Sequence, residues 1–228
     1  MQAVVCRHTH PSQPQGRWGF SFLSTILFID GRNVQGKLTD VLNPTHDSKV
    51  QIDFATYDFA GLFRSVLSGI TVDCRIFYFG RLQLHKETKE KSLELIEKQR
   101  ALKSSLEKQG FEVVLAGRVR GHLERCPKGH ETLTFKEKGV DVRMAVDMIT
   151  LACEGVLKTA IVASSDSDLQ PAIKGLRELG AQSIYVGFER QPNKGLSATT
   201  TRTILIRTTE IEAAVRQTAL LASVPRAA

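Results

Sequence analysis

Several features that mark large classes of protein are absent from this chain. The four cysteines, Cys6, Cys74, Cys126 and Cys153, lie far apart and form no CxxC pair, which argues against a secreted disulfide scaffold and favours a reducing compartment. The one apolar run near the start, residues 18–29, is too short to span a bilayer, and no small-residue cleavage site follows it. We therefore expect a cytoplasmic protein with no membrane partner.

Length and composition fit one globular domain. The chain has 228 residues, of which 42% are hydrophobic and 24% charged, and it shows no internal repeat or low-complexity tract. A chain of this size buries roughly 70% of its unfolded surface on folding, so it needs no metal or disulfide for a core. We expect a flexible extension over residues 1–24, a domain over residues 25–221 and a tail over residues 222–228.

The charge balance is mildly basic. Lys and Arg number 31 against 24 Asp and Glu, a formal net charge of +7, which is only a weak indication of a polyanionic partner. Residues 117–138 form a basic excursion with six Lys or Arg and three Glu, and residues 133–135 are expected as a short strand within it. The positions of the acidic residues, which are the minority, are therefore more informative than the net charge.

Apolar strand patterns alternate with helical patterns along the chain. The expected strands are residues 26–29, 72–79, 111–116, 160–163, 184–186 and 204–206, and the expected helices are residues 57–67, 86–108, 140–153, 169–179 and 209–221. Residues 36–56 carry little periodicity and are expected as a loop. Continuous apolar strands separated by helices predict an α/β fold, a doubly wound, mostly parallel sheet with helices on both faces.

Carboxylates follow the expected strands at the edge where such folds bind ligands. Asp30 ends the first strand and precedes Asn33. The strand at residues 160–163 leads into Ser164, Ser165, Asp166 and Asp168, and Asp141 lies in the first turn of the helix at residues 140–153. We expect these side chains at one sheet edge.

Clustered carboxylates repel one another unless a cation shares the site. An all-oxygen set favours Mg²⁺ or Mn²⁺ over Zn²⁺. Each residue taken alone has a structural alternative: Asp30 in a turn, Asp141 at a helix dipole, and Asp166 as a helix cap. Asp147 lies in mid-helix, either on a solvent-exposed stripe or as a semi-buried carboxylate that needs a partner.

Residues 29–33, 138–147 and 163–169, taken in this order, resemble the NYN domain family, which has the PIN-like ribonuclease fold, and in particular its bacterial LabA-like members. The resemblance implies a central strand order 3-2-1-4-5 and an acidic Mg²⁺ or Mn²⁺ site that cuts RNA. It assigns metal binding to Asp30, Asp141 and Asp166, a further acidic role to Asp168, support of the first Asp to Asn33, and an acidic position of less defined role to Asp147.

The expected function is a metal-dependent ribonuclease, an endonuclease that acts on single-stranded RNA. Ser164 and Ser165 would support the site, and Lys138, Arg118 and Arg120 are candidate phosphate contacts, with a solvated rim as the equal alternative. An RNA-binding or scaffold module with little turnover is the alternative function. The expected partner is RNA, either single-stranded or structured. The chain could also form a homo-oligomer.

Two other classes are disfavoured. A phosphatase of another doubly wound family would carry Asp-x-Asp after the first strand, where this chain has Arg32, and no GxGxxG motif for a dinucleotide follows that strand. His122, Cys126 and His130 recur every four residues and could supply half of a zinc site. Because no fourth ligand lies nearby in the sequence, a metal-free loop is favoured there.

Overall fold

The computed structural model describes residues 24–43, 52–84, 89–125 and 131–223. Within these ranges only the backbone is described at residues 120–125, 131–136 and 220–223. The expected N-terminal extension lies outside these residues apart from Ser24, as does most of the expected tail. Among the helices of the described part, none is both long and apolar enough to cross a membrane.

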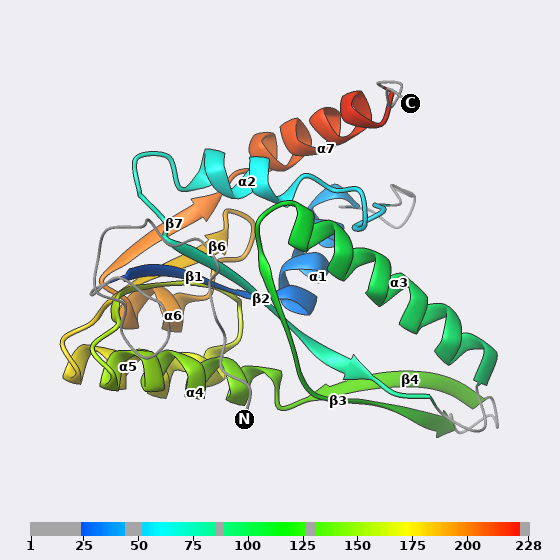
Figure 1. The fold of residues 1–228 in the computed structure, drawn as a ribbon, viewed down its shortest axis with the longest axis horizontal. Helices are drawn as coiled ribbons and strands as arrows, with labels where there is room; N and C mark the ends of the chain where they lie inside the picture. Colours follow the sequence, from blue (N-terminus) through cyan, green and yellow to red (C-terminus); the bar gives the residue numbers. More distant parts are fainter. Residues whose placement is uncertain (1–23, 44–51, 85–88, 126–130, 224–228) are drawn as a thin grey trace.

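One sheet runs through the molecule (Figure 1). Its strands are β1 (Ser24–Asp30), β2 (Cys74–Leu82), β3 (Glu112–Arg125), β4 (Glu131–Lys138), β5 (Leu157–Ala163), β6 (Gln182–Phe188) and β7 (Arg202–Ile206). Their order is β4-β3-β2-β1-β5-β6-β7, and all neighbours are parallel except β3 and β4. The central order β3-β2-β1-β5-β6 confirms the predicted order 3-2-1-4-5 and the predicted fold class.

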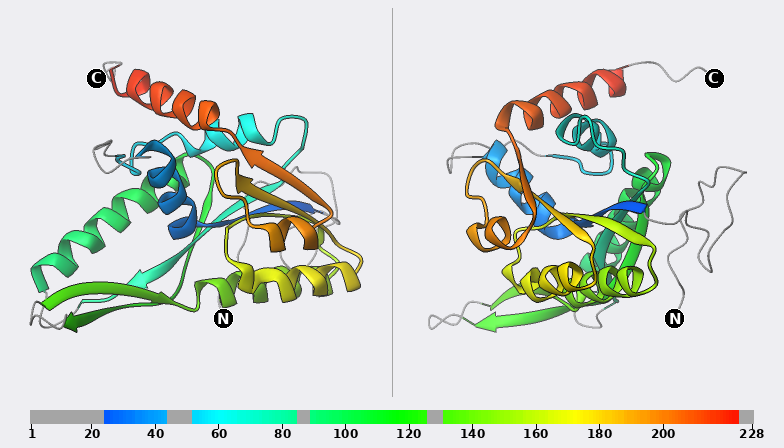
Figure 2. Two further views of the ribbon diagram at one scale, coloured as in Figure 1. Left: turned by 180° about the vertical axis from the view of Figure 1, so that it is seen from behind. Right: turned by 90° about the vertical axis from the view of Figure 1, so that its left-hand side faces the viewer.

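Helices cover both faces of the sheet (Figure 2). The helices are α1 (Gly31–Leu42), α2 (Phe59–Val66), α3 (Lys89–Lys108), α4 (Val140–Cys153), α5 (Gln170–Glu178), α6 (Lys194–Thr199) and α7 (Thr208–Ser223), with a 3₁₀ turn, η2 (Ser167–Leu169). Leu27 and Ile29 of β1 face the core under α1, α2 and α7, whereas Ile26 and Phe28 face α4, α5 and α6. Burial on both faces explains the continuous apolar strands.

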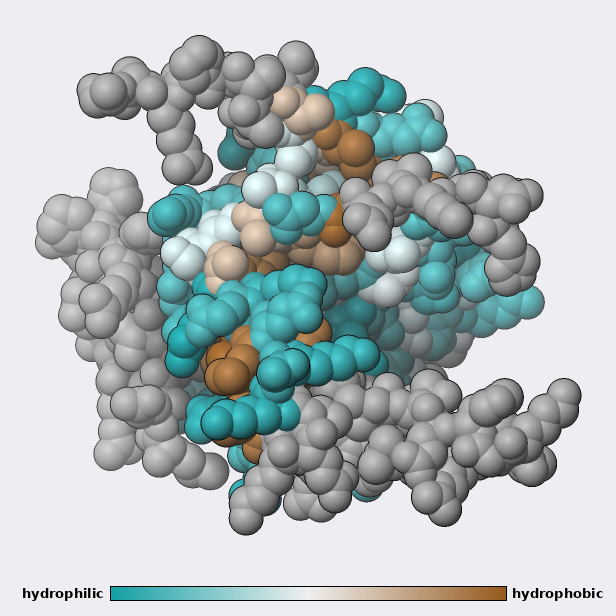
Figure 3. Space-filling model, turned by 90° about the vertical axis from the view of Figure 1, so that its right-hand side faces the viewer, coloured by the Kyte–Doolittle hydropathy of each residue, from teal (hydrophilic) through white to brown (hydrophobic). Residues whose placement is uncertain are grey.

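Helix α3 shows why the polar surface was predictable. Its outer face carries the ion pair between Glu94 and Lys98 and a further pair between Arg100 and Glu97, while Leu106 is buried. Seen from the side that lies at the right of Figure 1, the described surface is mainly hydrophilic, with small apolar patches (Figure 3).

The expected loop at residues 36–56 is wrong over its first part, because α1 continues to Leu42. Asp30 caps this helix by accepting a hydrogen bond from the Asn33 N–H, and Val34 and Leu38 are fully buried one turn apart. The exposed Gly36 and the polar residues around it hide this apolar stripe in the sequence.

The basic excursion is also different from its expected form. Residues 117–138 are not a loop with one short strand, because β3 continues to Arg125 and pairs antiparallel with β4. Arg118 lies opposite Lys138 in this register, and Val119 lies opposite Glu137. The two strands form a β-hairpin that extends beyond the parallel part of the sheet (Figures 1 and 2). The expected strands are continuous apolar runs, whereas the strands of this hairpin alternate apolar with polar residues, a pattern typical of strands exposed on one face.

A glycine lets the hairpin approach the start of α4. Gly117 has a φ of +59°, and a Cβ atom there would overlap the carbonyl oxygen of Lys138. Both the left-handed backbone and the close contact exclude other residues at this position without a shift of the chain.

Gly117→Ala should therefore lower the free energy of unfolding by about 1–3 kcal/mol, since it combines backbone strain with a backbone clash. Gly36→Ala is the matched control, because nothing lies within 4 Å of its added Cβ and the residue is exposed in α1. That variant should gain about 0.5–1 kcal/mol. Urea unfolding of both variants measures the difference, and equal effects would contradict the role given to Gly117.

Candidate functional site

Two segments bring three carboxylates together at the carboxyl edge of the parallel strands. Asp166 and Asp168 follow β5, and Asp141 lies in the first turn of α4. One carboxylate oxygen from each of the three lies within 4.8 Å of the others. Asp141 and Asp166 are half-buried, and Asp168 is exposed. The structure thus brings together two of the predicted metal ligands, with Asp168 as the third member of the group.

Asp30 lies beside this group and is not one of its three members. Its Oδ1 accepts a hydrogen bond from the Asn33 N–H at 3.1 Å, and its Oδ2 accepts one from the Ser164 hydroxyl at 3.2 Å. Burial raises the pKa of Asp30 above its ordinary value, the two hydrogen bonds oppose this, and the charges of Asp166 and Asp141 raise the pKa further. The carboxylate is therefore held in the negative field of the other two.

A hydrogen-bond network joins the turn after β1 to the turn after β5. The Asn33 Oδ1 accepts from the Ser165 N–H at 2.9 Å, and the Ser164 Oγ accepts from the Asp166 N–H at 3.1 Å. The side chain of Asn33 thus supports the turn after β5, and only its backbone N–H contacts Asp30. Ser164 is buried, and its hydroxyl contacts both Asp30 and the Asp166 N–H.

The helix-end roles that the sequence suggested for Asp30, Asp141 and Asp166 are observed as well. Asp30 caps α1, and Asp166 caps η2 by accepting from the Asp168 N–H at 2.9 Å. Asp141 lies in the first turn of α4, where the helix dipole favours an acidic side chain. A single acidic side chain is enough to cap a helix or to interact with its dipole, so these roles explain each residue separately. They do not explain why three carboxylates lie close together.

Asp147 lies elsewhere on α4. Its Oδ1 accepts from the Arg143 Nε at 2.8 Å, and its Oδ2 accepts from the Tyr78 hydroxyl at 3.1 Å. Burial, followed by the charge of Asp147, raises the pKa of Tyr78 well above its ordinary value. Of the two readings of Asp147, the semi-buried carboxylate with partners is the observed one, and the residue is not part of the close group.

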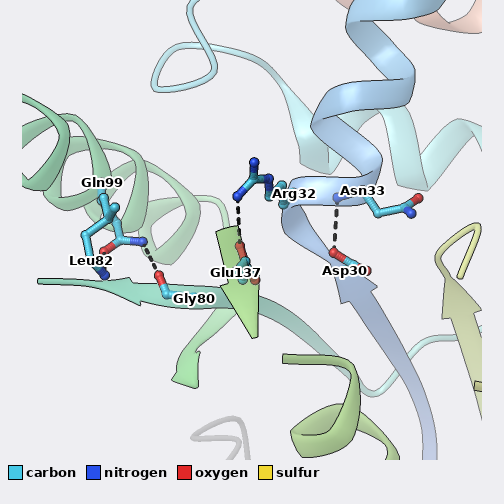
Figure 4. A network of polar contacts seen from close by, with 7 residues as sticks. All are labelled: Asp30, Arg32, Asn33, Gly80, Leu82, Gln99 and Glu137. Carbon is cyan, nitrogen blue, oxygen red and sulfur yellow. Dashed lines mark hydrogen bonds and ion pairs between the residues drawn. The ribbon is translucent and has the colours of Figure 1, made fainter. Parts of the chain in front are cut away.

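Two residues near the site were missed from the sequence. Asn193, which caps α6, donates from its Nδ2 to the Ser165 carbonyl at 2.9 Å and so supports the turn after β5. Glu137 of β4 has a side chain only 14% exposed, with the Arg32 Nη1 4.0 Å from its Oε2 (Figure 4). Burial, and then the charge of Asp30, raise the pKa of Glu137, whereas Arg32 lowers it.

The basic residues named from the sequence lie on the hairpin. Arg118 and Lys138 are exposed and face each other in the register of β3 and β4. Arg120 pairs with Lys136 through the backbone, but its side chain lies outside the described part. The same holds for the side chain of His122, and Cys126 and His130 lie outside the described residues altogether.

The donor set fits a hard divalent cation. Asp141, Asp166 and Asp168 offer only carboxylate oxygens, which suit Mg²⁺ and Mn²⁺ better than Zn²⁺. A cation there would offset the repulsion that the pKa of Asp30 records.

Taken together, the sheet order, the helices on both faces and the acidic edge define a doubly wound α/β domain with an acidic group at the carboxyl edge of its sheet. The NYN domain family matches the chain over residues 24–207, and the protein belongs to that family. NYN domains are typically nucleases. No curated protein gives a significant match, and membership of the LabA-like subtype stays a prediction.

The position of Asp30 predicts a pH-dependent stability. Its folded pKa is raised above the ordinary value of 3.8, so the folded protein binds this proton more tightly than the unfolded chain. In chelator, the wild type should therefore lose stability as pH rises from about 3.8 through the folded pKa. The Asp30→Asn variant keeps the helix cap but has no carboxylate to ionise at this position, so it does not lose stability in this way. Its free energy of unfolding relative to wild type should therefore increase between pH 3.8 and the folded pKa and stay constant above that pKa.

Urea unfolding of both proteins from pH 4 to pH 8 measures the effect. Asp40→Asn, at an exposed position of α1, is the control for the removal of one carboxylate from the same helix. A constant difference between Asp30→Asn and wild type would contradict the described field.

Proposed function

We propose that the protein is a divalent-metal-dependent ribonuclease that hydrolyses phosphodiester bonds in single-stranded RNA as an endonuclease. The observation that carries this proposal is the convergence of Asp141, Asp166 and Asp168 beside the partly buried Asp30 in a chain of the NYN family. Unpaired carboxylates are costly to gather. Helix capping explains each position separately, but only a bound cation would offset the repulsion between the gathered carboxylates.

Asp30, Asp141 and Asp166 would hold Mg²⁺ or Mn²⁺, with Asp168 close to Asp141 and Asp166. When bound, such a cation supplies charge neutralisation at the phosphate and a lower pKa for a coordinated water. The chain itself fixes the carboxylates: Asn33 and Ser164 join the two turns that carry them. Asp168 is the exposed member, so its carboxylate is the candidate to accept the proton of the attacking water.

The hairpin supplies the positive charge next to this edge. Arg118 and Lys138 are exposed and lie opposite each other, although like charges in this position destabilise a strand pair. A phosphate backbone would relieve that repulsion. Contacts of this kind position RNA without reading its sequence, which suits an enzyme whose specificity lies elsewhere.

Purified wild-type protein should cleave single-stranded RNA with Mg²⁺ or Mn²⁺ and lose this activity in chelator. Asp166→Asn should lower the rate by about 100-fold or more, because it removes a charge of the close group while an Asn side chain can still cap η2. Initial rates on an end-labelled RNA measure the loss, and internal fragments distinguish endonucleolytic from exonucleolytic cleavage. Asp40→Asn is the matched control and should retain wild-type rates.

Full activity of Asp166→Asn would refute the site assignment. Tight RNA binding without cleavage under several divalent metals would instead favour the RNA-binding or scaffold function.

Lys138→Gln and Arg118→Gln should each weaken RNA binding by a similar factor for all sequences. Each substitution removes one phosphate contact, so the slope of log K against log salt should fall by about 0.7 for single-stranded RNA. Fluorescence anisotropy in chelator, where no cleavage takes place, measures both quantities. Lys158→Gln is the control, at an exposed position near the opposite end of β5. Unchanged slopes for the hairpin variants would place the RNA on another surface.

A further inference from the structure

Tyr78 of β2 connects the sheet to helix α4. Its hydroxyl donates a hydrogen bond to the Asp147 Oδ2 at 3.1 Å, and its fully buried ring packs against Phe28 of β1. Burial raises the pKa of Tyr78, so the hydroxyl keeps its proton and remains a donor. Tyr78 lies beside Asp30 in the parallel pairing of β1 with β2. The hydrogen bond therefore joins α4 to the sheet at the level of Asp30.

Asp147 extends this connection to the beginning of α4. Its Oδ1 accepts a hydrogen bond from the Arg143 Nε at 2.8 Å, and the two side chains are 17% and 34% exposed. Solvent and salt screen a partly buried pair of this kind less than an exposed one. Arg143 follows Asp141 by two residues. The chain of contacts from Tyr78 thus ends beside the turn that carries Asp141.

The beginning of α4 has no side-chain cap to fix it. Gly139 occupies the N-cap position with a φ of +83°, whereas the carboxylates of Asp30 and Asp166 cap the helical turns that follow them. Val140 and Met144 hold α4 against the core through apolar contacts. Such contacts are not directional, whereas a hydrogen bond restricts both a distance and an angle. The contact with Tyr78 therefore supplies a restraint that packing alone lacks.

We propose that Tyr78 is a positioning residue of the acidic site. Through Asp147 and Arg143 it sets the place of Asp141 relative to the carboxylates that follow β5. The proposal rests on the proposed function in one respect, because it needs a cation to be bound by these carboxylates. Stability alone does not require a polar connection between α4 and the sheet, since well-packed apolar side chains of similar volume stabilise such a layer equally well.

Mn²⁺ binding to the full-length, metal-free protein tests the proposal without reference to activity, and electron paramagnetic resonance of free Mn²⁺ gives the affinity. Tyr78→Phe removes one hydroxyl and keeps the ring. It should weaken Mn²⁺ binding by about 5-fold, less than the loss of a group that hydrogen-bonds a metal ligand directly. Tyr57→Phe is the matched control, because Tyr57 is equally buried on the other face of the sheet and its hydroxyl has no hydrogen-bond partner. It should bind Mn²⁺ as wild type.

A double variant separates positioning from a general loss of packing. Asp147→Ala breaks the same connection one step closer to Asp141 and should weaken Mn²⁺ binding at least as much as Tyr78→Phe. The variant with both substitutions should bind as Asp147→Ala alone, because the hydroxyl then has no carboxylate to act through. Ile149→Val, which loosens the packing of α4 apart from this connection, should leave the affinity unchanged.

Equal Mn²⁺ affinities in wild type and Tyr78→Phe would overturn the proposal, and so would additive losses in the double variant. A wild type that binds Mn²⁺ but cleaves no RNA would refute the proposed function and leave the role of Tyr78 standing. Absence of Mn²⁺ binding in the wild type would refute both. Circular dichroism in chelator verifies that each variant is folded, and Tyr78→Phe with its control decides the question if Asp147→Ala is not.

Discussion

The parallel pairing of β1 with β5 is the constraint on which the site depends. It sets Ile29 beside Ala163, so the residues that follow both strands emerge at the same edge. The Ser164 hydroxyl then reaches Asp30, and the Asn33 side chain reaches the Ser165 N–H. Without this pairing the residues that follow β1 and β5 would not meet, and these hydrogen bonds between them could not form.

Electrostatics gives this edge its chemical character. The chain as a whole has a net charge of +7, yet the residues gathered at the end of β1 and β5 are carboxylates. Positive charge lies beside them on the hairpin, at Arg118 and Lys138. A polyanion is therefore attracted by the surroundings and repelled by the centre unless cations are bound there.

The parallel core and part of the site could be predicted because their signals are local. Helix α4 was predicted with its observed bounds, Val140–Cys153, and the Asp residues after β1 and β5 follow from the strands themselves. The hairpin, the helix α1 and Glu137 were missed for a different reason. Glu137 comes near Asp30 only through the order of the sheet, in which β3 and β2 lie between β4 and β1, and the residues around Glu137 do not encode that order.

The network between Asp30 and Ser164 spans 134 residues of sequence, and this separation has a consequence for biosynthesis. Contacts so distant along the chain form only after the intervening elements have been made and paired. A nascent or truncated chain that ends before β5 carries Asp30 but neither Asp166 nor the turn that holds it. An incomplete product of this length therefore cannot assemble the acidic edge.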